Sequence, residues 1–333
     1  MNENFWVVLQ KIIVMFVLIA MGLLFRKRGY LDEQATQSVS LLLVDVIYPS
    51  LVFTQMLNTV NREALFELWY IPLLAMLLMF VALLVGWIFL PLLSKKEERH
   101  TLRFLVMVFN WVYLPLPIVE GLFGADGVKI VLLANVGFQV MLWSVGIWVL
   151  RGGKPELDDL KAILVNPGLI ATLLGIAIAV LYGGANALSN HSLHKGSVLL
   201  GAFSIVVQAM AMLGSLTIPL SLLLTGVQLG SLKLNRLKIS KELFAVILLR
   251  LIVAPVITVA LFNIMASFNL TIPFVQKMSL YLISFMPVAI SCSIITERYK
   301  RNTELAAQAI FYSTFISIIT VPVAYYLIVR FGV

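Results

Sequence analysis

The residues best suited to binding a small molecule lie in an apolar run at 101–123, which contains two closely spaced prolines. Pro115 and Pro117 each lack a backbone N–H, and each proline ring clashes with the carbonyl group one turn earlier in a helix. The pair therefore predicts an unwound segment whose freed carbonyl and N–H groups line a protein-enclosed or water-filled space. Three polar side chains flank it and can complete a site: Asn110, Tyr113 and Glu120. The alternative is a kinked helix with only a structural role.

A second apolar run, at 275–296, has a proline at the matching place. Pro287 follows Met286, and Ser291 and Ser293 come four and six residues later, where their hydroxyl groups can bond a ligand or the freed backbone. Two broken helices that cross would point the N-terminal ends of their second halves at one spot. Because these ends carry partial positive charge, the sequence predicts a site for an organic anion. The alternative is that both serines bond only carbonyls of their own helix.

Three ionisable side chains lie within apolar runs. A charge at the centre of a membrane helix costs about 2.5–3.5 kcal/mol on insertion scales, so each is a candidate functional residue. Asp45 and Glu120 are candidates for a carboxylate that binds and releases a proton, and Asp45 is favoured because it lies one turn before Pro49. The alternative for Glu120 is simple hydration near the end of its run. Arg250 is predicted either to bind a substrate carboxylate or to form a structural ion pair.

The composition identifies the class of protein. Hydrophobic residues make up 61% of the 333 residues, charged residues make up 12%, and the mean hydropathy is +1.01. Soluble chains are roughly a quarter charged, so we expect an all-α polytopic membrane protein. The net charge of +8 indicates cytoplasmic loops rather than binding to nucleic acid.

The sequence lacks the residues of most enzymes and metal sites. A single cysteine, Cys292, excludes an intrachain disulfide. The histidines fall in predicted loops, which argues against a buried metal site: His100, His191 and His194. No phosphate-binding loop, nucleophile elbow or His/Glu metal pair is present. We therefore expect neither an enzyme nor a cofactor.

The hydrophobic pattern predicts ten transmembrane helices. Each apolar run is near or above the roughly 20 residues that a helix needs to cross a bilayer, and is too long and continuous for a barrel strand. The longest run is too short for two spans and is interpreted as one helix with an outer lead-in. The runs are 5–25, 36–58, 66–93, 101–123, 127–150, 161–184, 198–230, 241–267, 275–296 and 303–330.

Basic residues predict the orientation of the chain. With alternate loops on opposite sides, 17 Lys and Arg residues lie on one side and 6 on the other. Because cytoplasmic loops collect Lys and Arg, we expect a multi-pass protein of the plasma (inner) membrane with both termini outside. The N-terminus lacks the positive region of a cleaved signal peptide, and Arg26-Lys27-Arg28 follows the first run as a stop-transfer flank.

The span count predicts an inverted repeat. A polar loop at 151–160 separates five spans in 1–153 from five spans in 154–333. Because five is odd, the second half enters the membrane in the opposite sense, which is the plan of many secondary transporters. Two proline pairs share an offset of 170 residues and fall in corresponding spans: Pro49 with Pro219, and Pro117 with Pro287.

Several short motifs occur in order over nearly the whole chain. They are Gly29-Tyr30-Leu31-Asp32-Glu33, Tyr48-Pro49-Ser50-Leu51-Val52-Phe53, Asn110 seven residues before Pro117, Met286-Pro287, Glu297-Arg298-Tyr299 and Glu304-Leu305-Ala306-Ala307. Together they resemble the auxin efflux carrier family, which includes plant auxin exporters and bacterial proteins described as malate permeases.

The resemblance implies a fold similar to that of bile-acid symporters, with two inverted five-helix repeats. Spans 1, 2, 6 and 7 would form a scaffold, and spans 3–5 and 8–10 a moving transport domain. Spans 4 and 9 would be broken and would cross beside the substrate, and dimers would form through the scaffold. The scaffold wall would then carry Tyr48, Pro49, Ser50, Pro219 and Ser221.

Two positions depart from the family pattern. Ser291 stands four residues after the proline, where many relatives have Asn, so substrate contacts there would differ. Trp111-Val112 replaces the usual Thr-Gly after Asn110 and makes the pocket bulkier. The loop between spans 5 and 6 is short, unlike that of plant exporters, and auxin is not the expected substrate.

The sequence therefore predicts a secondary active transporter, an efflux carrier or permease for a small organic anion such as a carboxylate. Transport would proceed by elevator-like alternating access in the lipid bilayer, with H⁺ or Na⁺ as the coupling ion. Rival hypotheses are a ligand-binding membrane sensor and a passive channel of the same fold. A soluble signalling domain would favour a sensor, whereas the longest predicted loops have about 13 residues.

Overall fold

The computed structural model describes residues 3–94, 96–153, 165–182, 198–231 and 239–331. Within these ranges the regular structure is helical, apart from one isolated β-bridge. Six helices there are long and apolar enough to cross a membrane: Glu33–Asn58, Leu65–Leu93, Pro115–Arg151, Gly201–Ser231, Lys241–Ser267 and Thr303–Arg330. The chain is therefore an all-helical membrane protein with several long apolar helices.

The helices up to the central loop are α1 (Glu3–Lys27), α2 (Glu33–Leu42), η1 (Leu43–Ile47), α3 (Tyr48–Thr59), α4 (Arg62–Leu68), α5 (Ile71–Leu93), η2 (Lys96–Glu98), α6 (Arg99–Met107), α7 (Pro115–Met141), η3 (Leu142–Gly146) and α8 (Ile147–Arg151). Those after it are α10 (Pro167–Tyr182), α12 (Val198–Ser215), α13 (Thr217–Ser231), α14 (Lys241–Leu248), η5 (Leu249–Val253), α15 (Ala254–Ser267), α16 (Phe274–Ser284), α17 (Ser291–Arg298) and α18 (Thr303–Phe331). The segments η1, η3 and η5 are π-helical turns inside longer helices, a feature that is frequent at functional sites.

Two of the helices, α2 and α14, begin at a side chain that accepts a hydrogen bond from one of their first N–H groups. The Asp32 carboxylate accepts from the Ala35 N–H at 2.7 Å at the start of α2. The Ser240 hydroxyl does the same for the Leu243 N–H at 3.1 Å at the start of α14. These two caps lie just before the apolar runs, and they fix where α2 and α14 start.

Helix α7 joins two apolar runs through a kink. Gly124, inside α7, has φ +59° and ψ −144°. Only glycine reaches this backbone region without a Cβ penalty. The kink lies between the apolar runs at 101–123 and 127–150, which are joined here in one long helical stretch, Pro115–Arg151.

Some sequence predictions lie at the edge of the described chain or beyond it. His191 and His194 lie outside the described residues, and so does the part of the loop at 151–160 that follows residue 153. The prediction that His100 lies in a loop is wrong, because α6 begins at Arg99, ahead of its apolar run. Its Nδ1 atom lies 3.2 Å from the Val149 carbonyl oxygen.

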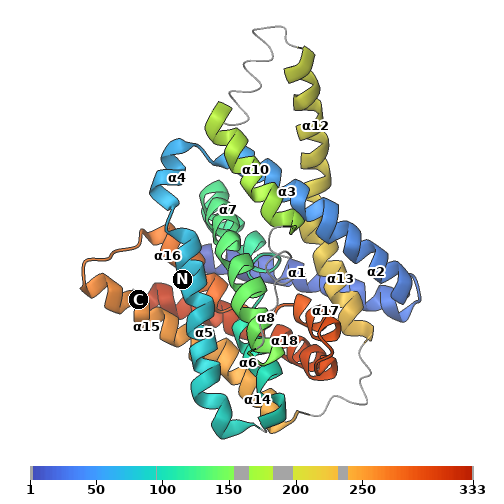
Figure 1. Ribbon diagram of the computed structural model, residues 1–333, viewed down its shortest axis with the longest axis vertical. Coiled ribbons are helices and arrows are strands. Elements are labelled where there is room, and N and C mark those ends of the chain that lie inside the picture. Colours follow the sequence, from blue (N-terminus) through green and yellow to red (C-terminus); the bar gives the residue numbers. More distant parts are fainter. Residues whose placement is uncertain (1–2, 95, 154–164, 183–197, 232–238, 332–333) are drawn as a thin grey trace.

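The helices form two groups of close neighbours (Figure 1). In one group α1 packs along α13, and α3 packs along α10 and α12. In the other, α5 and α16 pack against α7, and α14 and α15 lie against α5. The pieces that are interrupted by non-helical backbone, α6 with α7 and α16 with α17, belong to the second group.

The contact between α1 and α13 depends on glycine. A Cβ added at Gly226 would lie 1.9 Å from the Ile19 carbonyl oxygen, and one added at Gly22 would lie 2.0 Å from the Leu223 carbonyl oxygen. Both distances are far below van der Waals contact. The two backbones can therefore approach this closely only because both positions lack a side chain.

We expect Gly226→Ala to destabilise the protein, because overpacking a close contact costs about 1–3 kcal/mol. Gly201→Ala is the matched control: residue 201 lies in α12, where no atom would lie within 4 Å of a new Cβ. Alanine favours a helix over glycine by up to about 1 kcal/mol, so the control should be neutral or stabilising. Thermal unfolding of the purified variants measures both changes. Equal unfolding temperatures for the two variants would contradict the close contact.

Candidate functional site

Two helices are interrupted where the sequence predicts broken spans. Helix α6 ends at Met107 and α7 begins at Pro115, whereas α16 ends at Ser284 and α17 begins at Ser291. We call the two non-helical segments, 108–114 and 285–290, the crossing. Four helix ends meet these segments, and all of them leave backbone groups that need partners.

The first break does not lie where the prolines were predicted to place it. Pro115 and Pro117 occupy the first turn of α7 and lie after the unwound segment, not in the middle of a helix. Proline is favoured there because the N–H groups of the first turn have no helical partner in any case. Pro287, by contrast, lies inside its break. The shared offset of 170 residues therefore does not give Pro117 and Pro287 equivalent structural positions.

The two breaks are hydrogen-bonded to each other. The Asn110 N–H donates to the Pro287 carbonyl at 2.8 Å, and the Ala289 N–H donates to the Val108 carbonyl at 3.1 Å. An antiparallel bridge between Phe109 and Val288 lies between these bonds. Segments that are about 180 residues apart in the sequence thus satisfy each other's backbone.

The polar side chains predicted for the first segment differ in their positions. Asn110 is buried, and its Oδ1 atom accepts from the Leu114 N–H at 3.3 Å, one residue before α7. Tyr113 packs edge-on against Tyr48, with ring centroids 5.8 Å apart. Glu120 lies on the exposed surface of α7. Asn110 and Tyr113 therefore belong to the crossing, and Glu120 does not.

Tyr48 provides a further polar group beside the crossing. Its side chain is 6% exposed, and its hydroxyl group has no hydrogen-bond partner within the described part of the chain. Nearly all buried polar groups are hydrogen-bonded in folded proteins. A buried hydroxyl without a partner, next to Tyr113, is therefore suited to a water molecule or a ligand.

The residues of the second segment are largely engaged within the protein. Met286 is buried, and the Val288 N–H donates to the Ser313 hydroxyl at 3.1 Å. The Ser293 hydroxyl donates to the Ile290 carbonyl at 2.9 Å, which is the local bonding that was the alternative to ligand binding. Ser291 lies in the first turn of α17, half-buried. Ser313 was missed in the sequence because a serine in the middle of a long apolar helix carries no local signal.

Arg250 bonds to backbone carbonyl groups at the crossing. Its side chain is 1% exposed, and Nε donates to the Met286 carbonyl at 3.2 Å. Nη2 donates to the Ser284 carbonyl, and Nη1 lies 3.5 Å from the Val106 carbonyl oxygen. The guanidinium carbon lies 4.2 Å from the centre of the Phe109 ring.

The structure does not bring the predicted carboxylates to this arginine. Asp45 is exposed in the π-helical turn η1, and Glu120 is exposed in α7. The ion pair found among the described residues joins Lys129 to Asp126 at 3.2 Å. Asp45 precedes Tyr48 by three residues, and it is Tyr48 that contacts Tyr113 of the crossing.

The predicted scaffold-wall residues lie in α3 and in α13, which contacts the turn η1 just before α3. Pro49 and Ser50 are buried, and the Ser50 hydroxyl donates to the Val46 carbonyl at 2.7 Å. Pro219 is half-buried in α13, and the Ser221 hydroxyl donates to the Ile218 carbonyl at 2.9 Å. Both serines are thus bonded within their own helices.

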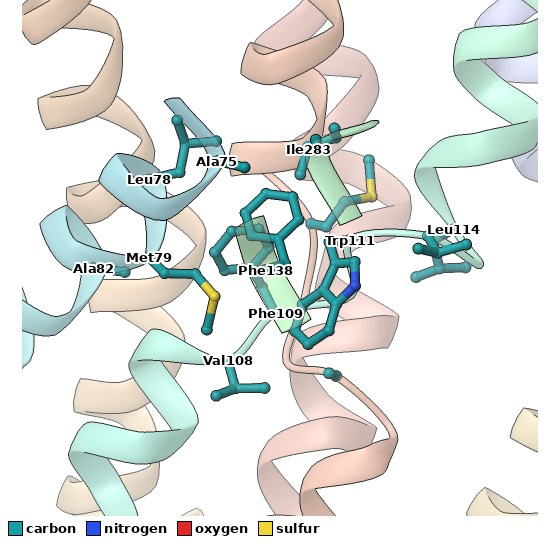
Figure 2. Close-up of a cluster of buried hydrophobic side chains, with 14 of the residues drawn as sticks. Ala75, Leu78, Met79, Ala82, Val108, Phe109, Trp111, Leu114, Phe138 and Ile283 are labelled. Atoms are coloured by element: carbon teal, nitrogen blue, oxygen red, sulfur yellow. The ribbon is translucent and has the colours of Figure 1, made fainter. Parts of the chain in front are cut away.

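A cluster of aromatic rings packs against one side of the crossing. Trp111 stacks on Phe138 with ring centroids 5.4 Å apart, and Phe109 packs edge-on against both. Figure 2 shows these rings between side chains of α5, such as Met79, and Leu114. The Trp111 indole N–H donates to Asn135 Oδ1 at 2.9 Å, while the Asn135 amide nitrogen has no partner in the described chain. The bulky replacement at 111 is thus part of the packed core.

Two hollows lie at the surface of the described structure. One of about 340 Å³ is lined by Asn61, Arg62, Glu63 and residues 179–181. One of about 230 Å³ is lined by Glu98, Ser240, Glu242, Asn302, Glu304, Leu305 and Gln308. Neither includes a residue of the crossing.

An all-helical membrane chain with interrupted helices that meet at their breaks defines a class, the membrane transport proteins, in which irregular backbone lines the substrate site. Comparison with known families agrees. A model of the family described as membrane transport protein matches residues 7–325, and the chain belongs to this family, that of the auxin efflux carriers. It is a transporter and not an enzyme.

Two curated relatives align along almost their whole length. The chain is 22% identical over 314 residues to an uncharacterized transporter of Methanocaldococcus jannaschii, covering 93% of this chain and 95% of the relative. It is 22% identical over 322 residues to an uncharacterized transporter of Methanothermobacter thermautotrophicus, covering 94% and 96%. The similarity therefore extends over nearly the whole length of both relatives.

The Trp111–Asn135 bond gives a stability test. We expect Trp111→Phe to lower the free energy of unfolding by about 1–3 kcal/mol, because it leaves the side-chain oxygen Oδ1 of Asn135 buried without a donor. Adding Asn135→Leu removes the unpaired amide, so the double variant should recover much of this loss. Thermal unfolding of both single variants, Trp111→Phe and Asn135→Leu, and of the double variant measures the effect. Losses that simply add would show that the two side chains are not coupled.

Proposed function

We propose that this membrane transporter is a secondary active carrier that moves a small organic anion, such as a carboxylate, by elevator-like alternating access. The observation that carries the proposal is the crossing itself, where two interrupted membrane helices are hydrogen-bonded at their breaks. Such discontinuous helices hold the substrate near the middle of the bilayer in many secondary transporters.

The preference for an anion rests on the helices that begin at the crossing. Helices α7 and α17 both start there, and neither begins with a side-chain cap. Because Pro115 and Pro117 have no N–H, the start of α7 can attract an anion through the helix dipole but offers it few hydrogen bonds. The N-terminal end of a helix carries a partial positive charge, which attracts an anion. The hydroxyl group of Tyr48, buried without a partner beside Tyr113, is suited to donate a hydrogen bond to such a ligand.

We further propose ten spans in two inverted repeats, 1–153 and 154–333. The pairing of neighbours supports this plan, because the first span (α1) packs on the seventh (α13) and the second (α3) on the sixth (α10). An inverted repeat relates span 1 to span 6 and span 2 to span 7, so the pair of spans 1 and 7 is equivalent to the pair of spans 6 and 2. Near the expected axis, the Thr217 hydroxyl lies 3.3 Å from the Ile47 carbonyl oxygen, and these residues are 170 positions apart.

The same plan assigns the moving parts. Spans 1, 2, 6 and 7 would be the scaffold, which explains why glycine-dependent backbone contact holds α1 to α13. Spans 3–5 and 8–10 would move together as the transport domain. The Tyr48–Tyr113 contact then lies between scaffold and transport domain, where the substrate must enter. Dimers through the scaffold and both termini outside complete the proposal.

We expect Asn110→Ala to weaken ligand binding and transport by about tenfold or more, because it removes a buried hydrogen-bonding group at the crossing. Asn263→Ala, in α15, is the matched control and should behave as wild type. Thermal-shift binding of carboxylic acids and uptake into vesicles at equal expression measure the two variants. Undiminished binding and flux in Asn110→Ala would remove this side chain from the site.

Proton coupling, if it occurs, needs a carboxylate, because arginine stays protonated. We expect Asp45→Asn to abolish the response of flux to a pH gradient while substrate exchange continues. Glu120→Gln is the comparison, since both carboxylates are exposed on their helices. Loss of the pH response only in Glu120→Gln would move the role to Glu120. A normal response in both variants would favour Na⁺ coupling or facilitated diffusion.

A further inference from the structure

Arg250 is held by backbone carbonyl groups. A charge inside a membrane helix is usually paired with another charged group or with backbone carbonyls. Arg250 is 1% exposed, and no carboxylate pairs with it in the described part of the chain. Its hydrogen-bond partners are the carbonyl groups of Ser284, Met286 and Val106.

These carbonyl groups belong to the helix ends that stop at the crossing. Val106 lies in the last turn of α6, Ser284 is the last residue of α16, and Met286 follows it. The last carbonyl groups of a helix have no partner in their own helix and carry a partial negative charge. The guanidinium group therefore neutralises the two negative helix ends at the crossing. Its position over the Phe109 ring fixes it against one of the two breaks.

The two helix ends that start at the crossing have the opposite charge. Helices α7 and α17 begin at Pro115 and Ser291 without side-chain caps. Pro115 and Pro117 have no N–H, and the Leu116 N–H donates to the Val112 carbonyl at 2.9 Å, so the partial positive charge at the start of α7 comes from the helix dipole and not from free N–H groups. The guanidinium group neutralises the two negative helix ends, whereas the two positive ends have no counterion. The net charge around the crossing is therefore positive. The unpartnered, buried hydroxyl of Tyr48 beside Tyr113 independently marks a place for a ligand there.

We infer that Arg250 is a positioning residue that gives the crossing its preference for anions. It does so by neutralising the carbonyl ends of α6 and α16, without contacting the substrate. This inference rests on the proposed function and names the chemical group that is selected, a carboxylate in preference to a neutral amide of the same shape. A lysine at this position would keep the charge, but its three N–H donors leave one nitrogen atom and cannot match the wide planar fork of the guanidinium.

The test compares carboxylates with amides in the full-length protein. Aliphatic mono- and dicarboxylates and the corresponding amides are titrated against purified wild type, Arg250→Met, Arg250→Lys and Arg103→Met, with thermal shift as the readout. Arg103 is the matched control, because its guanidinium carbon lies 5.6 Å from the centre of the Trp87 ring, away from the broken ends. We expect Arg250→Met to reduce the carboxylate-to-amide affinity ratio by about tenfold. Arg250→Lys should retain most of this ratio even if the protein is less stable, and Arg103→Met should keep all of it.

The outcomes separate the inference from the proposed function. An unchanged ratio in Arg250→Met, with carboxylate binding intact in wild type, would overturn the inference and leave the proposed function standing. Wild type that binds no carboxylate would overturn both. If Arg250→Met does not fold, the lysine variant decides: a ratio that collapses although the charge is kept shows that only the hydrogen-bond geometry matters, which overturns the role in charge preference.

Discussion

Backbone groups freed inside an apolar helix must find partners within the protein, and this requirement shapes the centre of the molecule. Lipid offers no hydrogen bonds, so every N–H and C=O released where α6 and α16 stop is a penalty unless the chain satisfies it. The breaks meet this requirement by bonding to each other through Asn110 and Pro287. The remaining groups are bonded by side chains brought from elsewhere, including Ser313 and Arg250.

This arrangement links the electrostatics of the crossing to its stability. The guanidinium that satisfies the carbonyl ends also removes their negative charge, so one side chain serves both needs. The aromatic cluster around Trp111 excludes water from the same region, which makes uncompensated partial charges more effective. Under the proposed function, the orientation of the helix ends then determines which ligand charge is favoured at the crossing.

The packing within one group of helices differs from the contact between the two groups. The contact of α1 with α13 brings backbone against backbone at Gly226, which permits little relative movement. The contact of Tyr48 with Tyr113 joins side chains edge-on across the boundary between the groups, with a hydroxyl left unpaired. Side-chain contacts of this kind can be exchanged for others more easily than an interlocked backbone. Under the proposed function, this difference suits the fixed and moving parts of an alternating-access carrier.

The sequence by itself determined the class of protein, the location of the apolar helices and the existence of two interruptions, because length, hydropathy and proline act locally. It misplaced the first break relative to Pro115, since a helix can begin at a proline as well as end before one. Only the tertiary structure decided that Arg250 bonds carbonyl groups, that Asn135 accepts from Trp111, and that Asp45 lies exposed. These facts depend on which segments, far apart in the chain, meet in space. The partner of a buried polar group is chosen by that packing, and no local pattern records it.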